Sequence, residues 1–151
     1  MREVIGRFDS TTLAGRRLSV PDDLTGPTLL LFAYRQHQQA DVDTWIRSIA
    51  DDATVRILEV PVLGRRWLPG RRFIDGGMAS NMDRTTREQT MCVYTDVTAF
   101  RRDVLGVDSS EVLAALVDVT GHVHWHAQGP ASDTGAEDLR QTLAQVKGGQ
   151  G

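Results

Sequence analysis

The chain has 151 residues, of which 40% are apolar and 25% charged, a composition typical of one globular domain with its own core. A net charge of −3 argues against general nucleic-acid binding, and the longest apolar run, residues 28–34, is too short to span a bilayer. With Cys92 as its single cysteine, the chain can form neither an internal disulfide nor a thiolate zinc cage.

The start of the chain has no apolar segment of the secretory type, and we expect a cytoplasmic protein. Sixteen of the 17 basic residues are arginine, which we interpret as the composition bias of a bacterial or archaeal genome.

Residues 1–27 are predicted to form a short β-rich lead-in, because Arg16–Val20 alternates weakly and turn residues follow it. The main domain, 28–147, begins with a continuous apolar run at Thr28–Tyr34, which indicates a strand covered on both faces. A helix is predicted at Asp41–Ala50, with one buried stripe formed by Val42, Trp45, Ile46 and Ile49.

A second strand is predicted at Thr54–Val60 and is expected to end at Pro61. An irregular, arginine-rich insert at residues 63–88 follows, with one helix near Arg71–Met82. Three further strands are expected at Gln89–Tyr94, Val112–Val117 and His122–Ala127, the last two as a hairpin. Two further helices are expected at Val97–Leu105, which Asp96 can cap and Gly106 can stop, and at Thr134–Val146. The tail, 148–151, is predicted to be disordered.

Alternation of strands and helices predicts an α/β fold with a largely parallel sheet and an antiparallel edge. The second half of the chain carries the run Tyr94-Thr95-Asp96 … Phe100 … Leu105-Gly106 … Leu116-Val117-Asp118 … Gly121 … Trp125 … Gly129. This run and the element order resemble the thioredoxin-like superfamily. The resemblance implies a mixed central sheet with helices on both faces and a C-terminal β-hairpin plus helix.

Within that superfamily, the chain resembles the mitochondrial ATP synthase assembly factor family, the tenth ATPase complex subunit, which also lacks the redox cysteine pair. The matching residues are Trp45, Leu116-Val117-Asp118, His124-Trp125 and Gly129-Pro130-Ala131. The chain departs from the superfamily in having no proline between Pro69 and Pro130, so the usual cis-proline beside the active site is absent. The resemblance implies a non-redox, assembly-type role.

In a redox-active thioredoxin fold, the nucleophilic cysteine lies in the turn after the first central strand. Here that turn reads Arg35-Gln36-His37-Gln38-Gln39. Tyr34, Arg35 and His37 are therefore the candidate catalytic residues, since arginine can clamp a carboxylate or phosphate and histidine can act as an acid or base near neutral pH. The alternative is a solvated polar turn that remained after the redox centre was lost.

Two other groups of residues are candidate binding sites. His122, His124 and His126 alternate along one predicted strand and are expected to share a face, where they can bind a metal ion or simply be exposed at the sheet edge. Residues 61–90 carry six arginines against three acidic residues, in a chain that is acidic overall. A basic insert of this kind suggests a partner-binding surface, formed by Arg65, Arg66, Trp67, Arg71 and Arg72. The alternative is a solvated connector.

Cys92 is expected to be a buried, inert thiol.

Two functions stay open. One is a non-redox adaptor or assembly-type factor that binds an acidic protein partner. The other is a cofactor-free enzyme, or a binder of an anionic small molecule, that reuses the vacated cleft. A deep pocket lined by Phe32, Tyr34 and Trp45 favours the second, and a flat or filled surface favours the first. No cofactor is expected in either.

Overall fold

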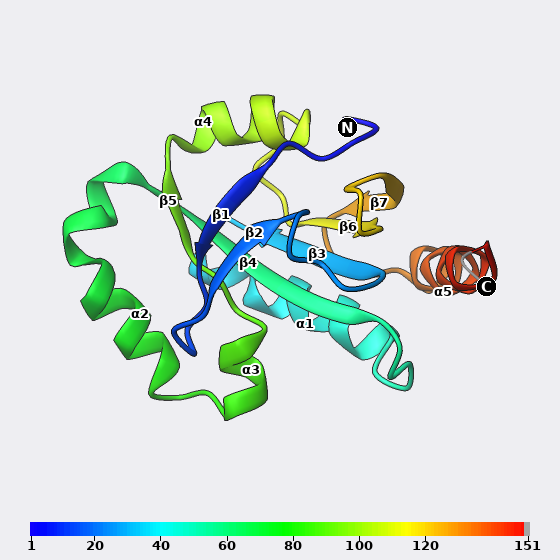
Figure 1. The fold of residues 1–151 in the computed structure, drawn as a ribbon, viewed down its shortest axis with the longest axis horizontal. Helices are drawn as coiled ribbons and strands as arrows, with labels where there is room; N and C mark the ends of the chain where they lie inside the picture. The colour runs from blue at the N-terminus through cyan, green and yellow to red at the C-terminus, as the bar shows by residue number, and fades with distance from the viewer. Residues whose placement is uncertain (150–151) are drawn as a thin grey trace.

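The computed structural model describes residues 1–149 (Figure 1). The elements are β1 (Phe8–Thr11), β2 (Arg17–Val20), β3 (Thr28–Ala33), the 3-10 turn η1 (Gln36–Gln38), α1 (Gln39–Ser48), β4 (Arg56–Gly64), the 3-10 helix η2 (Arg65–Gly70), α2 (Arg71–Ala79), α3 (Arg84–Glu88), β5 (Val93–Thr95), α4 (Val97–Phe100), the π-helical turn η3 (Arg101–Leu105), β6 (Leu113–Val117), β7 (Val123–Gln128) and α5 (Asp133–Gly149). In this part of the chain, no helix is long and apolar enough to cross a membrane.

The central sheet has five strands in the order β5-β4-β3-β6-β7. β3 pairs in parallel with β4, β4 pairs in parallel with β5, and β6 and β7 add an antiparallel edge. β3 is flanked on both sides and is buried almost along its whole length, as its continuous apolar sequence predicts. The predicted mixed sheet of a thioredoxin-like fold is confirmed.

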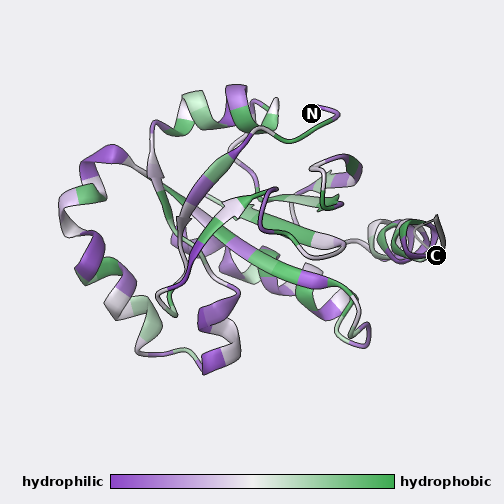
Figure 2. Ribbon diagram, in the orientation of Figure 1, coloured by the Kyte–Doolittle hydropathy of each residue, from purple (hydrophilic) through white to green (hydrophobic). Residues whose placement is uncertain are grey.

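One face of the sheet packs against α1 and α5. The predicted stripe of α1 is confirmed, since Val42, Trp45 and Ile49 are each at most 3% exposed and Ile46 packs beside them. Trp45 donates its indole Nε1–H to the carbonyl of Gly129 over 2.8 Å. Figure 2 shows the apolar residues gathered along the central strands.

The opposite face is covered by α4 and by the β1–β2 hairpin, which belongs to the predicted β-rich lead-in. Phe8 from the hairpin, Phe32 from β3 and Phe100 from α4 form a cluster whose ring centroids lie 5.4–5.9 Å apart. Helices therefore cover both faces, as expected, and the lead-in contributes to the same core.

Several element boundaries differ from the predictions, and β5 begins only at Val93 although the strand was expected from Gln89. Three further differences concern β4, the helix capped by Asp96 and α5. β4 runs through Pro61 to Gly64, because Pro61 lies where pairing with β3 ends. Pairing with β5 is interrupted there, since proline has no N–H to donate. The helix capped by Asp96 is α-helical only to Phe100, then forms the π-helical turn η3 before Gly106 (φ 68°) ends it. α5 extends to Gly149, two residues into the predicted disordered tail, and residues 150–151 lie outside the described part of the chain.

The arginine-rich insert forms three short helices, η2, α2 and α3, where one helix was predicted. In Figure 1, α2 lies at the left, beyond β5 at the edge of the sheet, and α3 lies at the bottom of the view. Asp83 starts α3 by accepting a hydrogen bond from the Thr86 N–H.

Candidate functional site

The turn between β3 and α1 is held by one buried glutamine. The Gln38 Oε1 accepts hydrogen bonds from the backbone N–H groups of Tyr34 (2.7 Å) and Arg35 (3.2 Å). Its Nε2 donates to the carbonyl of Ser110 in the loop before β6 (2.5 Å). Two backbone donors of this turn are thus already occupied by the protein.

Tyr34 lies apart from the other two candidate catalytic residues. Arg35 has an extended backbone (φ −142°, ψ 148°), so its side chain points away from that of Tyr34. Tyr34 packs against the core on the α4 side, where the Arg101 guanidinium carbon lies 4.1 Å from its ring centroid. Burial raises the pKa of Tyr34, and Arg101 partly opposes that rise.

Arg35 and His37 are exposed and line an open hollow of about 420 Å³. Gln38, Asp41, Ser110 and Glu111 complete its lining. Two acidic residues thus line the same hollow as the arginine and the histidine. The structure therefore brings Arg35 and His37 together, and it separates both from Tyr34.

A deep pocket lined by Phe32, Tyr34 and Trp45 is not possible in this fold. Phe32 is fully buried in the cluster on the α4 side, and Trp45 is 1% exposed in the cluster on the α1 side. The sheet lies between them. The three side chains therefore do not line a common pocket.

Cys92 is fully buried under α2, as expected of an inert thiol. Burial is the main reason that its pKa is raised to about 12, and the neighbouring Asp75 carboxylate raises it further. Its sulfur lies 3.6 Å from that of Met78. A thiolate is therefore strongly disfavoured at this position, and the chain has no other cysteine.

Arg71 belongs to the packing of α2 and not to an exposed surface. Its guanidinium binds Asp75 (3.3 Å) and the Ser10 hydroxyl in β1 (2.7 Å), and it stacks over the Tyr94 ring, whose hydroxyl donates to Asp75 over 2.6 Å. This network, which the sequence analysis missed, attaches α2 to the hairpin and to β5. Its sequence signal is the spacing of Arg71, Asp75 and Met78 on one helix face.

The remaining predicted partner-binding residues lie on an exposed surface, here called the insert face. Arg65, Arg66 and Arg72 are exposed, and the Arg66 guanidinium carbon lies 5.2 Å from the ring centroid of Trp67. Trp67 is 47% exposed, Leu68 49% and Phe73 90%. The sequence analysis did not include Leu68 and Phe73 in this surface, although both lie within two residues of an arginine pair in the sequence. The insert face thus combines arginine with exposed large apolar side chains.

The three histidines do not share one face of β7, so that expectation is wrong. A bulge at His124 shifts the β6–β7 register, and it places Val123 against the α4-side core and Trp125 against the α1-side core. The rings of His122 and His124 are in contact at 5.0 Å, and His124 Nε2 lies 2.8 Å from Asp118. Between residues 1 and 149, no three histidine, cysteine or acidic side chains are arranged to hold a metal ion.

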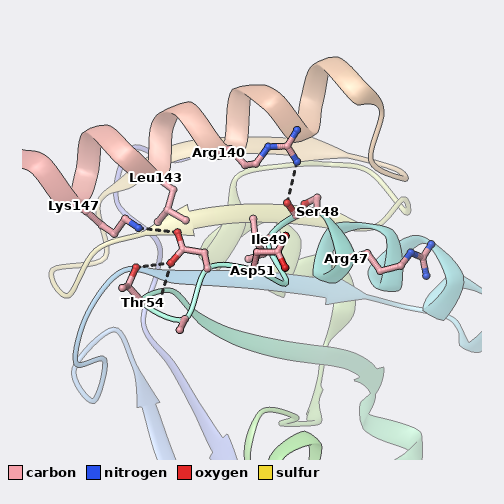
Figure 3. Close-up of a pocket in the computed structure, with 10 residues that line it drawn as sticks. Arg47, Ser48, Ile49, Asp51, Thr54, Arg140, Leu143 and Lys147 are labelled. Carbon is pink, nitrogen blue, oxygen red and sulfur yellow. Dashed lines mark hydrogen bonds and ion pairs between the residues drawn. The ribbon is translucent and has the colours of Figure 1, made fainter.

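A further hollow, of about 690 Å³, lies at the other end of the molecule, between the end of α1 and α5 (Figure 3). Two of the three cations that line it are already paired. Lys147 binds Asp52 over 2.7 Å, and Arg140 donates to the carbonyl of Ser48 over 3.0 Å. These contacts attach α5 to the end of α1, and we interpret this hollow as a helix junction.

No protein-family model matches the sequence, and no curated protein is similar to it. Solved structures with a similar fold do exist. The chain is similar to a SCO1/SenC family lipoprotein from Bacillus anthracis, with a TM-score of 0.65 at 14% identity over 97% of this chain and 96% of that one. It is similar to yeast Sco1, with a TM-score of 0.64 at 13% identity over 95% and 96% of the two chains. It is also similar to the exposed lipoprotein thioredoxin Etrx1 from Streptococcus pneumoniae, with a TM-score of 0.59 at 16% identity over 93% and 100%. At these identities, the likeness identifies the thioredoxin-like fold.

Proposed function

We propose that this protein is a non-redox member of the thioredoxin-like fold that binds an acidic protein partner through the insert face. The observation that carries the proposal is the exposure of Trp67, Leu68 and Phe73 beside Arg65, Arg66 and Arg72. Monomeric proteins seldom expose large apolar side chains together, and aromatic residues with arginine are the types enriched at the centres of interfaces. The charges favour an acidic partner because the insert is basic in a chain that is acidic overall.

The absence of a thiol at the turn after β3 supports a role without disulfide chemistry. Two solved structures of similar fold concern proteins with other chemistry. Yeast Sco1 has been seen with copper bound, and BsSco is a member of the Sco family of cytochrome c oxidase assembly proteins with a disulfide switch. An assembly-type role, as the likeness to the ATP synthase assembly factor family implies, needs only a docking surface. The proposed setting is the cytoplasm of a bacterium or archaeon.

The test compares four forms of the tagged protein purified from the native host at low salt. The first is the wild type, the second is R65E/R66E/R72E, the third is R16E/R47E/R102E, and the fourth is W67A/F73A. The third form carries the same change in net charge at arginines exposed elsewhere. Arg71 is left unchanged because its reversal would detach α2. We expect one stoichiometric acidic protein with the wild type and the control, and its loss from R65E/R66E/R72E and from W67A/F73A. The same protein captured equally by all forms would overturn the proposal.

A further inference from the structure

The hollow beside the turn after β3 is lined by charges of both signs that do not pair with each other. Its volume is about 420 Å³, and its lining includes Arg35, Asp41 and Glu111. None of these three side chains takes part in an ion pair within residues 1–149. Open space between unpaired charges of opposite sign leaves room for a ligand that pairs with both.

A buried amide also lines this hollow. Gln38 is 7% exposed, and its Nε2 donates to the carbonyl of Ser110, which ties the turn to the loop before β6. A glutamine amide nitrogen carries two N–H donors. Among the residues that the structure describes, only one of the two has an acceptor. Because buried donors are nearly always paired, the second N–H favours an acceptor supplied by a ligand, such as a carboxylate oxygen.

The charges of the lining decide which ligand fits. Arg35 supplies one positive charge, and Asp41 and Glu111 supply two negative charges. A simple anion bound at Arg35 would be repelled by both carboxylates, and a simple cation bound at the carboxylates would be repelled by Arg35. A molecule that carries one charge of each sign can pair with all three side chains.

We propose that this hollow binds a zwitterion, a small molecule with one carboxylate and one ammonium group. Arg35 matches the carboxylate in a two-point contact, and the second N–H of Gln38 donates to the same group. Asp41 and Glu111 accept from the three N–H donors of the ammonium group. The site lies beyond the carboxyl end of β3, where ligands of open α/β sheets bind. It shares no residue with the insert face, so each site can be tested without the other.

The test is a titration of the folded protein, followed by NMR at the Gln38 side-chain amide and the Ser110 backbone N–H. Glycine, β-alanine and 4-aminobutanoate carry the two charges at increasing separation. The N-acetyl form of each keeps only the carboxylate, and the amide form keeps only the ammonium group. We expect saturable binding of the zwitterion whose spacing matches the site, and binding at least about tenfold weaker of its N-acetyl and amide forms. Tightest binding of glycine assigns the site to α-amino acids, and tightest binding of a longer spacing assigns it to molecules with separated charges, such as a short peptide.

Substitutions in the lining assign the role of each charge. Arg35→Gln should remove the preference for the zwitterion over its amide form, and D41N/E111Q should remove the preference over its N-acetyl form. Arg47→Gln, at an exposed arginine outside the hollow, is the matched control and should bind the zwitterion as the wild type does. Three results would each overturn the proposal: no saturable shift with any of the three zwitterions, blocked forms that bind as tightly as the zwitterion, or unchanged binding by R35Q.

Discussion

The thiol of Cys92 should be almost unreactive in the folded protein, and this follows from its place under α2. The side chain is fully buried between Met78 and the Asp75 carboxylate. Both burial and the nearby negative charge disfavour the thiolate, which is the form that reacts with alkylating and disulfide reagents. The prediction therefore tests directly whether the one cysteine of the chain is available for redox chemistry.

The size of the effect follows from the pKa. With a pKa of about 12, only about one thiol in 10,000 is ionised at pH 8, against about one in four for an ordinary cysteine with a pKa of about 8.5. The native Cys92 thiol should therefore be labelled about 2,000-fold more slowly than an ordinary cysteine at pH 8, and burial slows the reaction further by blocking access of the reagent. The raised pKa also makes folding pH-dependent. The stability it contributes is complete below about pH 8.5 and is lost at about 1.4 kcal/mol per pH unit as the pH rises toward 12.

The assay is the rate of thiol labelling at pH 8, for the native protein and for the same protein in denaturing urea. We expect rapid labelling in urea and labelling at least about 1,000-fold slower in the native state. Asp75→Asn should raise the native rate only modestly, because burial contributes most of the shift. Cys92→Ala should flatten the loss of stability above pH 8.5. A native rate within about tenfold of the rate in urea would refute the reasoning and reopen the question of thiol chemistry.

Three other substitutions test the packing that surrounds the candidate sites, each by urea denaturation. Glu59 is 9% exposed, and its pKa is raised mainly by burial. Glu59→Gln should therefore stabilise the protein by about 1 kcal/mol at pH 7. It should have no effect below about pH 4, because the carboxyl group is already neutral there. The pKa of Asp52 is held at about 2 mainly by the hydrogen bond from Lys147. Because the pair is partly exposed, Lys147→Met should lower the free energy of unfolding by only about 0.5 kcal/mol at pH 7. This loss should disappear as the pH falls toward 2, where Asp52 becomes protonated. Gln38→Ala should cost about 2 kcal/mol and speed amide exchange at Tyr34, because it leaves two backbone N–H groups and one carbonyl without their partner. Unchanged stability in all three would show that these contacts do not form in solution.

The resemblance identified the fold but not the function. The α/β class with an antiparallel edge was predicted from the order of the elements, and the helices on both faces from the resemblance; both are confirmed by the structure and by solved structures of similar fold. The candidate catalytic group was predicted from its position in the chain alone. Tyr34 and Arg35 are neighbours in an extended segment, and period-two alternation already implied that their side chains point apart.

The sequence by itself determined the features that depend on a few neighbouring residues. These include the apolar run of β3, the buried stripe of α1, the cap at Asp96, the stop at Gly106 and the absence of a redox thiol. Each follows from periodicity or backbone conformation within one or two turns of chain, where local energies are decisive.

Only the tertiary structure decided which polar residues are used in packing and which are left exposed. Arg71 and Arg72 are adjacent and chemically identical, yet one binds Ser10, 61 residues away, and the other is exposed. The bulge at His124 and the passage of β4 through Pro61 depend likewise on the partner strand. These arrangements depend on contacts between segments far apart in the chain, and the free energies of such contacts cannot be judged from neighbouring residues alone.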